Sequence, residues 1–68
     1  MDLKIELDRE TDGRWIAEIP ELNLLLYGAT RDEAIRRAES AAIEIIADRI
    51  QRGTLPAEAS NPVFGVAA

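Results

Sequence analysis

The chain has 68 residues, carries a net charge of −5 and contains neither cysteine nor histidine. It is too small for more than one domain. It also lacks the residues needed for disulfide bonds, a cysteine or histidine zinc site, or a Ser-His-Asp or Cys-His catalytic arrangement. Because a chain this short buries only about 60% of its surface on folding, we expect it to gain stability as a homo-oligomer, either a dimer or a higher assembly.

The first strand is predicted from residues 2–9, where apolar and polar side chains alternate strictly, as in a half-buried strand. Thr11-Asp12-Gly13 is predicted to be a turn, in which Asp-Gly suits the positive φ values of a tight hairpin, and residues 14–19 form the returning strand. Trp15 shares one face of that strand with Ala17 and Ile19. Pro20 lacks a backbone donor and ends the strand or places it at an edge.

A third strand is predicted from the short apolar run of residues 24–27, which we expect to be covered on both faces and central in the sheet. Thr30 begins a helix with capping-box spacing. Its hydroxyl is placed to accept from the Glu33 N–H, and the Glu33 side chain can reach back to the Thr30 N–H. Gly53 ends the helix. A turn-rich connection then leads to a short apolar strand over residues 63–66, which either returns to the sheet edge or is exchanged with a neighbouring subunit.

The fold class is therefore α+β, with a three-stranded antiparallel sheet, one long helix packed on it and a short C-terminal strand. Residues 1–29 form the antiparallel strands, 30–53 the helix, and 54–68 the connection and terminal strand of a single domain. The apolar arc of the helix spans roughly 200°, twice the 100° or so that docks one face. The excess needs a second surface, which is the C-terminal segment or another subunit. The residues predicted for this core or oligomer face are Ile35, Ala38, Ala42, Ile46 and Ile50.

Acidic side chains are concentrated in the strand half of the chain. Residues 1–29 hold seven acidic and three basic residues, whereas residues 30–53 hold five of each. An acidic sheet surface disfavours nucleic-acid phosphates and favours a basic protein partner, although plain solubility is the simpler alternative. Basic residues form no cluster, so we expect no direct nucleic-acid binding by this chain alone.

Catalysis is not predicted. The acids at positions 2, 6, 8 and 18 could share one sheet face and hold a divalent metal, but the same alternation places them on a solvated face without any function. We expect no catalytic residue, no metal and no cofactor. No apolar run approaches the roughly 20 residues of a membrane span, and the N-terminus lacks the pattern of a signal peptide, so we expect a cytoplasmic protein with no membrane partner.

Two aromatic residues with polar tips suggest a protein-binding surface beside the acids. Trp15 can instead fill the core against the helix, and Tyr27 ends the third strand. The residues predicted to contact a partner are Asp12, Trp15, Glu18, Glu21 and Tyr27.

The sequence resembles the HicB-like antitoxin family over nearly its whole length. The matching residues are Asp12-Gly13, Trp15, the block from Ala17 to Leu22, the Tyr27-Gly28-Ala29-Thr30 helix start, Glu33-Ala34, Ala47-Asp48-Arg49 and Asn61 to Phe64. Family members usually carry Pro-Gly after the Pro-Glu-Leu block, where this chain has Asn23-Leu24 and a loop one residue shorter.

This resemblance implies a partial RNase H-like fold without RNase H catalysis. It also implies a type II toxin-antitoxin system, in which the protein neutralises a small basic HicA-type RNA-cleaving toxin by covering it. The alternative is an orphan oligomeric HicB-like module with a structural or RNA-associated role and no enzymatic activity. Longer family members add a DNA-binding segment, which residues 1–68 do not contain.

Overall fold

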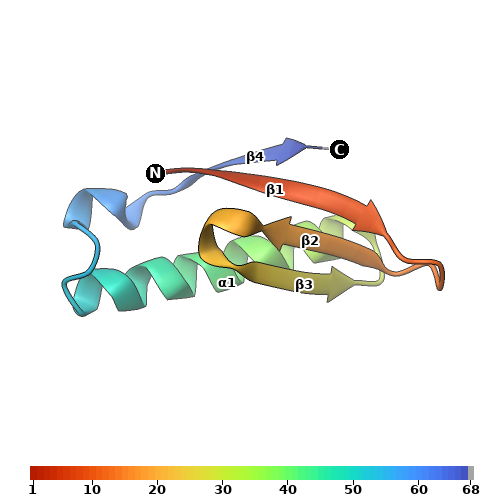
Figure 1. Ribbon diagram of the computed structural model, residues 1–68, viewed down its shortest axis with the longest axis horizontal. Coiled ribbons are helices and arrows are strands. Elements are labelled where there is room, and N and C mark those ends of the chain that lie inside the picture. Colours follow the sequence, from red (N-terminus) through yellow and green to blue (C-terminus); the bar gives the residue numbers. More distant parts are fainter. Residues whose placement is uncertain (68) are drawn as a thin grey trace.

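The computed structural model describes residues 1–67, which form one sheet and one long helix (Figure 1). The strands are β1 (Asp2–Arg9), β2 (Trp15–Ile19), β3 (Leu24–Gly28) and β4 (Val63–Ala67), the helix is α1 (Arg31–Gln51), and two short 3-10 helices are η1 (Pro20–Leu22) and η2 (Ala57–Ser60). The predicted α+β class is correct at this level. The sheet is four-stranded and mixed, in the order β3-β2-β1-β4, because β4 lies parallel to β1 while the other neighbours are antiparallel.

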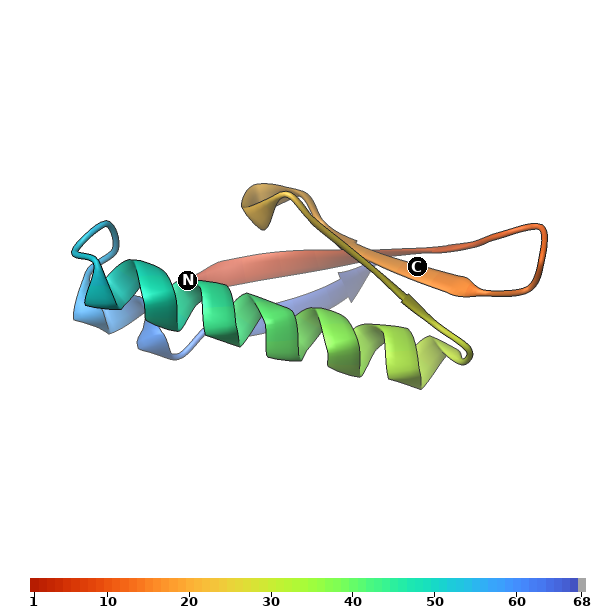
Figure 2. The same ribbon diagram turned by 90° about the horizontal axis from the view of Figure 1, so that it is seen from below.

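The helix packs on one side of the sheet and leaves the other side uncovered (Figure 2). It lies mainly against β3 and β2, whereas β1 and β4 lie to one side of it. The molecule is elongated, with extents of 40 × 17 × 16 Å.

The core lies between α1 and the alternate residues of the strands that face it. Its fully buried side chains include Ile5 of β1, Ala17 and Ile19 of β2, and a stripe of four helix residues, Ala34, Ala38, Ala42 and Ile46. The three alanines of this stripe let the helix axis come close to the sheet. Ile46 is the one large side chain of the stripe and is also fully buried. Alternation in β1 and β2 thus gives the predicted result, with one face buried and the other exposed.

The turn between β1 and β2 consists of Thr11, Asp12 and Gly13, as predicted. Glu10 and Arg14 close it through a Glu10 N–H to Arg14 C=O hydrogen bond of 2.8 Å, and the Gly13 N–H donates to Glu10 C=O at 2.9 Å. Only Gly13 in this turn has a positive φ, 92°. This arrangement is a three-residue hairpin loop with glycine at its last position, a common alternative to the two-residue hairpin.

Strand β3 is an edge strand, so its predicted central position is wrong. Its apolar run does not mean burial on both faces, because Leu25 is 48% and Tyr27 38% exposed. Only Leu24, Leu26 and Gly28 turn toward the helix, as their partners Ile19, Ala17 and Trp15 in β2 do. The central strands of the sheet are β2 and β1.

The helix begins at Arg31 as predicted, and the Thr30 hydroxyl accepts from the Glu33 N–H at 3.1 Å. The return bond differs from the prediction. The Glu33 carboxylate accepts from the N–H of Ala29, at 2.8 Å, and not from that of Thr30. The side chain therefore also ties the helix to the residue that follows β3.

Candidate partner-binding face

The uncovered side of the sheet carries a compact grid of six outward side chains, which we call the open face: Glu6 and Asp8 of β1, Ile16 and Glu18 of β2, and Leu25 and Tyr27 of β3. The register of the strands sets the grid in two rows. One row runs Glu6, Glu18, Leu25 and the other runs Asp8, Ile16, Tyr27. Acids therefore occupy the β1 side of the open face and apolar groups the β3 side.

A shallow depression of about 240 Å³ lies within this grid, lined by Glu6, Leu7, Asp8, Ile16, Glu18 and Leu25. Its lining combines aliphatic side chains with three carboxylates. Glu6 and Glu18 are direct cross-strand partners. Like charges placed directly opposite each other destabilise a sheet, so a cationic group binding between them would relieve this repulsion.

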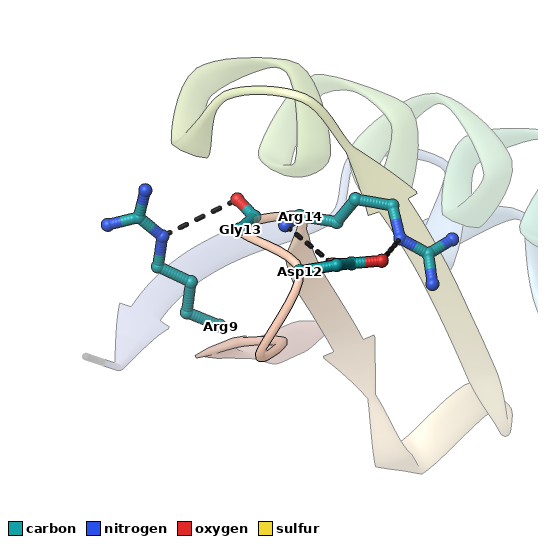
Figure 3. A network of polar contacts seen from close by, with 4 residues as sticks. All are labelled: Arg9, Asp12, Gly13 and Arg14. Atoms are coloured by element: carbon teal, nitrogen blue, oxygen red, sulfur yellow. Dashed lines mark hydrogen bonds and ion pairs between the residues drawn. The ribbon is translucent and has the colours of Figure 1, made fainter.

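The Asp12–Arg14 pair of the hairpin loop (Figure 3) lies at the tyrosine end of the open face, since Arg14 contacts Tyr27. The Arg14 N–H and Nε donate to the two carboxylate oxygens of Asp12, at 3.0 and 2.8 Å. The Arg14 guanidinium lies over the ring of Tyr27, 4.5 Å from its centroid. The hydrogen bond from the Arg14 backbone, followed in importance by the contacts of its side chain, lowers the pKa of Asp12. Asp12 thus offsets the positive charge of Arg14, which holds Tyr27 in place.

Three of the predicted partner-contact residues belong to this arrangement. Glu18 and Tyr27 lie on the open face, and Asp12 is linked to it through Arg14. The other two lie elsewhere. Trp15 turns to the helix side, half-buried against the core, with the Arg9 guanidinium 5.3 Å from its ring centroid. Glu21 lies on η1, where its carboxylate accepts from the Lys4 N–H at 3.4 Å.

The four open-face residues that were not among the predicted contacts are Glu6, Asp8, Ile16 and Leu25. Period-2 alternation does place the first three on the polar side of their strands, so that signal was present in the sequence. Leu25 gives no such signal, because it lies in an unbroken run of leucines. Its outward direction is set by pairing with Glu18 across β2 and β3.

The five residues predicted for the oligomer or core face of the helix differ in burial. Ala38, Ala42 and Ile46 are 0–1% exposed and pack wholly within the protomer. Ile35 and Ile50 are half-buried at the margin of the core. Beside them Ile43 is 50% exposed and, with Ile46, Ala47, Ile50, Gln51 and Ser60, borders a hollow of about 350 Å³.

In residues 1–67, no group of three or more acidic residues is placed to hold a metal ion. Within the same range, no helix is long and apolar enough to cross a membrane. The open face combines negative charge with exposed aliphatic and aromatic groups, a combination that suits a partner with basic and apolar groups side by side.

Comparison with known proteins adds no relative: no family model, no curated protein and no solved structure matches this chain.

Proposed function

We propose that this protein is an antitoxin-like binding protein that neutralises a small basic HicA-type RNA-cleaving toxin by occlusion. The observation that carries the proposal is the open face, where Glu6, Asp8 and Glu18 border the half-buried side chain of Ile16 and the exposed side chains of Leu25 and Tyr27. The resemblance of the sequence to the HicB-like family supplies the class of partner. The HicB-like domain and its partial RNase H-like fold belong to the same proposal, as does a cytoplasmic location.

The chemistry of the open face favours a protein over a nucleic acid. Carboxylates repel phosphates, whereas they attract the lysine and arginine side chains with which an RNA-cleaving protein holds its substrate. The apolar half of the grid supplies the desolvated contact, and the acids set the orientation and the rate of encounter. A toxin bound in this way would have its RNA-binding surface covered.

Occlusion requires no chemistry by the antitoxin itself. This fits a sequence without histidine or cysteine, whose serine and threonine hydroxyls have no imidazole to activate them. The role of the protein in this proposal is therefore that of a non-enzymatic inhibitor.

The test is binding to a small basic protein encoded beside this chain, measured by calorimetry and by rescue of growth on co-expression. Glu18→Lys should weaken the complex at least tenfold, or about 1.4 kcal/mol, because it places a cation at the centre of the grid. Glu44→Lys on the exposed side of α1 makes the same change of charge away from the open face and should leave the affinity unchanged. The absence of a complex and of growth rescue, or equal effects of the two variants, would exclude this function.

The second candidate function is the orphan oligomeric module. The edge strand β4 favours it, because its residues carry no charge that would oppose pairing with another chain. It would be supported if no basic reading frame lay beside the gene while the protein still assembled with itself.

A further inference from the structure

The two edges of the sheet differ in their protection. Along β3, the Arg37 side chain donates to the C=O of Tyr27 at 3.4 Å, and Glu33 and Arg36 line the same flank. Strand β4 has the sequence VFGVA, with no charged residue and no proline, and exposes Val63 and Val66 by 62% and 43%. Natural edge strands usually carry charges, prolines or covering segments that prevent pairing with another chain. Strand β4 has none of these within its described residues.

The direction of the free backbone groups of β4 follows from its pairing with β1. The Val63 N–H donates to the C=O of Met1 at 2.8 Å, and Val63 is the register partner of Asp2. Because successive residues of a strand point their N–H and C=O to opposite sides, Val63, Gly65 and Ala67 face β1. Phe64 and Val66 therefore direct their N–H and C=O away from the sheet, where a further strand would lie.

We propose that two copies of this chain pair antiparallel through β4 about a two-fold axis at Gly65. This register sets Phe64 of each copy opposite Val66 of the other. Both of these pairs exchange N–H and C=O bonds, so each outward backbone group of Phe64 and Val66 gains a partner. Gly65 meets Gly65 on the axis, at the non-hydrogen-bonded position.

Side-chain chemistry supports the same register. Phe64 and Val66 share the helix side of the sheet with their β1 partners Leu3 and Ile5. The paired strands would therefore place an aromatic ring against a β-branched side chain on that side, a favourable cross-strand combination. The helix does not cover this part of the sheet, since it lies mainly against β3 and β2.

Charge identifies a second copy as the occupant of this edge. Two chains of net charge −5 repel each other, and β4 is the strand that carries no charge in residues 63–67. Joining there brings two acidic molecules together with no carboxylate of β4 in the contact. A basic peptide, in contrast, would find no acid on β4 itself, and the acids of the adjoining hollow, Asp2 and Glu21, lie there together with Lys4. The two-fold axis would stand perpendicular to the sheet, so both helices would remain on one side and both open faces on the other.

The first test is the mass of the protein in solution by light scattering or sedimentation equilibrium at rising concentration. We expect twice the 7.5 kDa of one chain. Val66→Pro removes an outward N–H that the β1–β4 ladder does not use, and proline is tolerated at such edge positions. Its mass should fall by half, with an unchanged far-UV circular dichroism spectrum. Val66→Lys, which adds a charge and keeps the N–H, should also lower the mass if Val66→Pro fails to fold.

The matched control is Leu25→Lys, which makes the same kind of change at a similarly exposed residue of β3, the opposite edge strand. It should keep the doubled mass. Hydrogen exchange gives an independent readout. The amides of Phe64 and Val66 should be protected in the wild type, and the Phe64 amide should exchange freely in both monomeric variants.

A monomeric wild type, or a doubled mass that survives both Val66 variants, would overturn the proposal. The assembly does not depend on the proposed function, and the same variants separate the two. Val66→Pro should still bind the basic partner, whereas Leu25→Lys should remain a dimer and lose that partner.

Discussion

At the scale of single residues, Arg14 links the hairpin loop to the open face. Its backbone and Nε donate to Asp12, while its guanidinium stacks on Tyr27. The ion pair is exposed, so it contributes little to global stability. Its effect is local, because it fixes one rotamer of Arg14 and thereby the orientation of an aromatic side chain that a partner would meet.

Asp12 should therefore titrate below the ordinary range of an aspartate, since its folded pKa is lowered. A lowered folded pKa means that the stabilisation is present above the unfolded pKa, about 3.9, and is lost as the pH falls through the folded pKa. Acidification below about pH 4 should consequently loosen the hairpin loop. An NMR titration of the Asp12 carboxyl carbon measures this.

Arg14→Ala provides the control for that titration. The leading cause of the shift is the backbone N–H of residue 14, which alanine retains. Most of the lowering should persist in this variant. Its complete disappearance would show that the guanidinium is responsible.

Gly28 is required for a different reason, which is the close approach of β3 and α1. A Cβ at this position would lie against the backbone N of Ala34 and 2.8 Å from its Cα. These are backbone atoms at the start of the helix, so they cannot move aside as a flexible side chain would. Gly28→Ala should lower the free energy of unfolding by about 1–3 kcal/mol, as overpacking of a core does.

Urea denaturation measures this change. Gly65→Ala is the matched control when both glycine variants are made in the monomeric Val66→Lys background, because a Cβ at Gly65 meets no atom within 4 Å of the single chain. Its effect should stay within about 0.5 kcal/mol or be stabilising. Equal losses in both variants would contradict a steric role for Gly28.

At the scale of elements, the sequence predicts those strands and helix ends that depend only on neighbouring residues. Alternation identifies β1 and β2, Pro20 marks the end of β2, and Thr30 and Gly53 bracket α1 closely. The position of β3 was not predictable in the same way, because a run of apolar residues is consistent with either an edge or a central strand. Strand order depends on pairing between distant segments, which the pattern of one segment does not contain.

The same distinction holds for the residues of the candidate site: some follow from local patterns and others only from strand pairing. Glu18 and Tyr27 could be named from local patterns, while Leu25 enters the open face only through its register with β2. Trp15 and Ile16 are neighbours in sequence but face opposite sides of the sheet. The aromatic character of Trp15 therefore indicated an exposed surface less well than the alternation of the strand did. Asn23, at the position where the HicB-like sequences that this chain resembles usually carry Pro-Gly, adopts a left-handed conformation with φ of 54°. Asparagine tolerates this conformation better than most residues other than glycine.

The start of α1 gives the prediction at this scale. Thr30→Ala removes the hydroxyl that accepts from the Glu33 N–H and should destabilise the protein by about 1 kcal/mol. Thr11→Ala, in the hairpin loop, removes the same group from an exposed turn and should change stability by less than about 0.5 kcal/mol. Chemical denaturation of both variants distinguishes the cap from a general loss of a hydroxyl, and equal effects would rule out the cap.

At the scale of the whole molecule, one helix is too narrow to cover four strands. It lies mainly against β3 and β2, so the core is concentrated in that half, while Phe64 is only half-buried and Val66 is exposed. The proposed pairing through β4 would add contacts where the helix supplies none. The stability of such a protein depends on its own concentration.

Thermal and urea midpoints should therefore rise with protein concentration. For a dimer that unfolds to monomers, each tenfold increase adds about 1.4 kcal/mol per dimer to the apparent free energy of unfolding. Val66→Pro should remove this dependence. Midpoints of the wild type that do not change with concentration would show that the folded chain is stable alone.

The parallel ladder between β1 and β4 also has a consequence for the order of folding. It joins residue 2 to residue 63, so the intervening chain must be arranged before these strands can meet. The entropy lost in closing so long a loop makes such distant pairing slow to form. The hairpin of β1 and β2, together with β3 and α1, can assemble from near neighbours in the sequence, which leaves β4 as the last strand to dock and the first to detach. In an assembled pair, each terminal strand would hold the other in place.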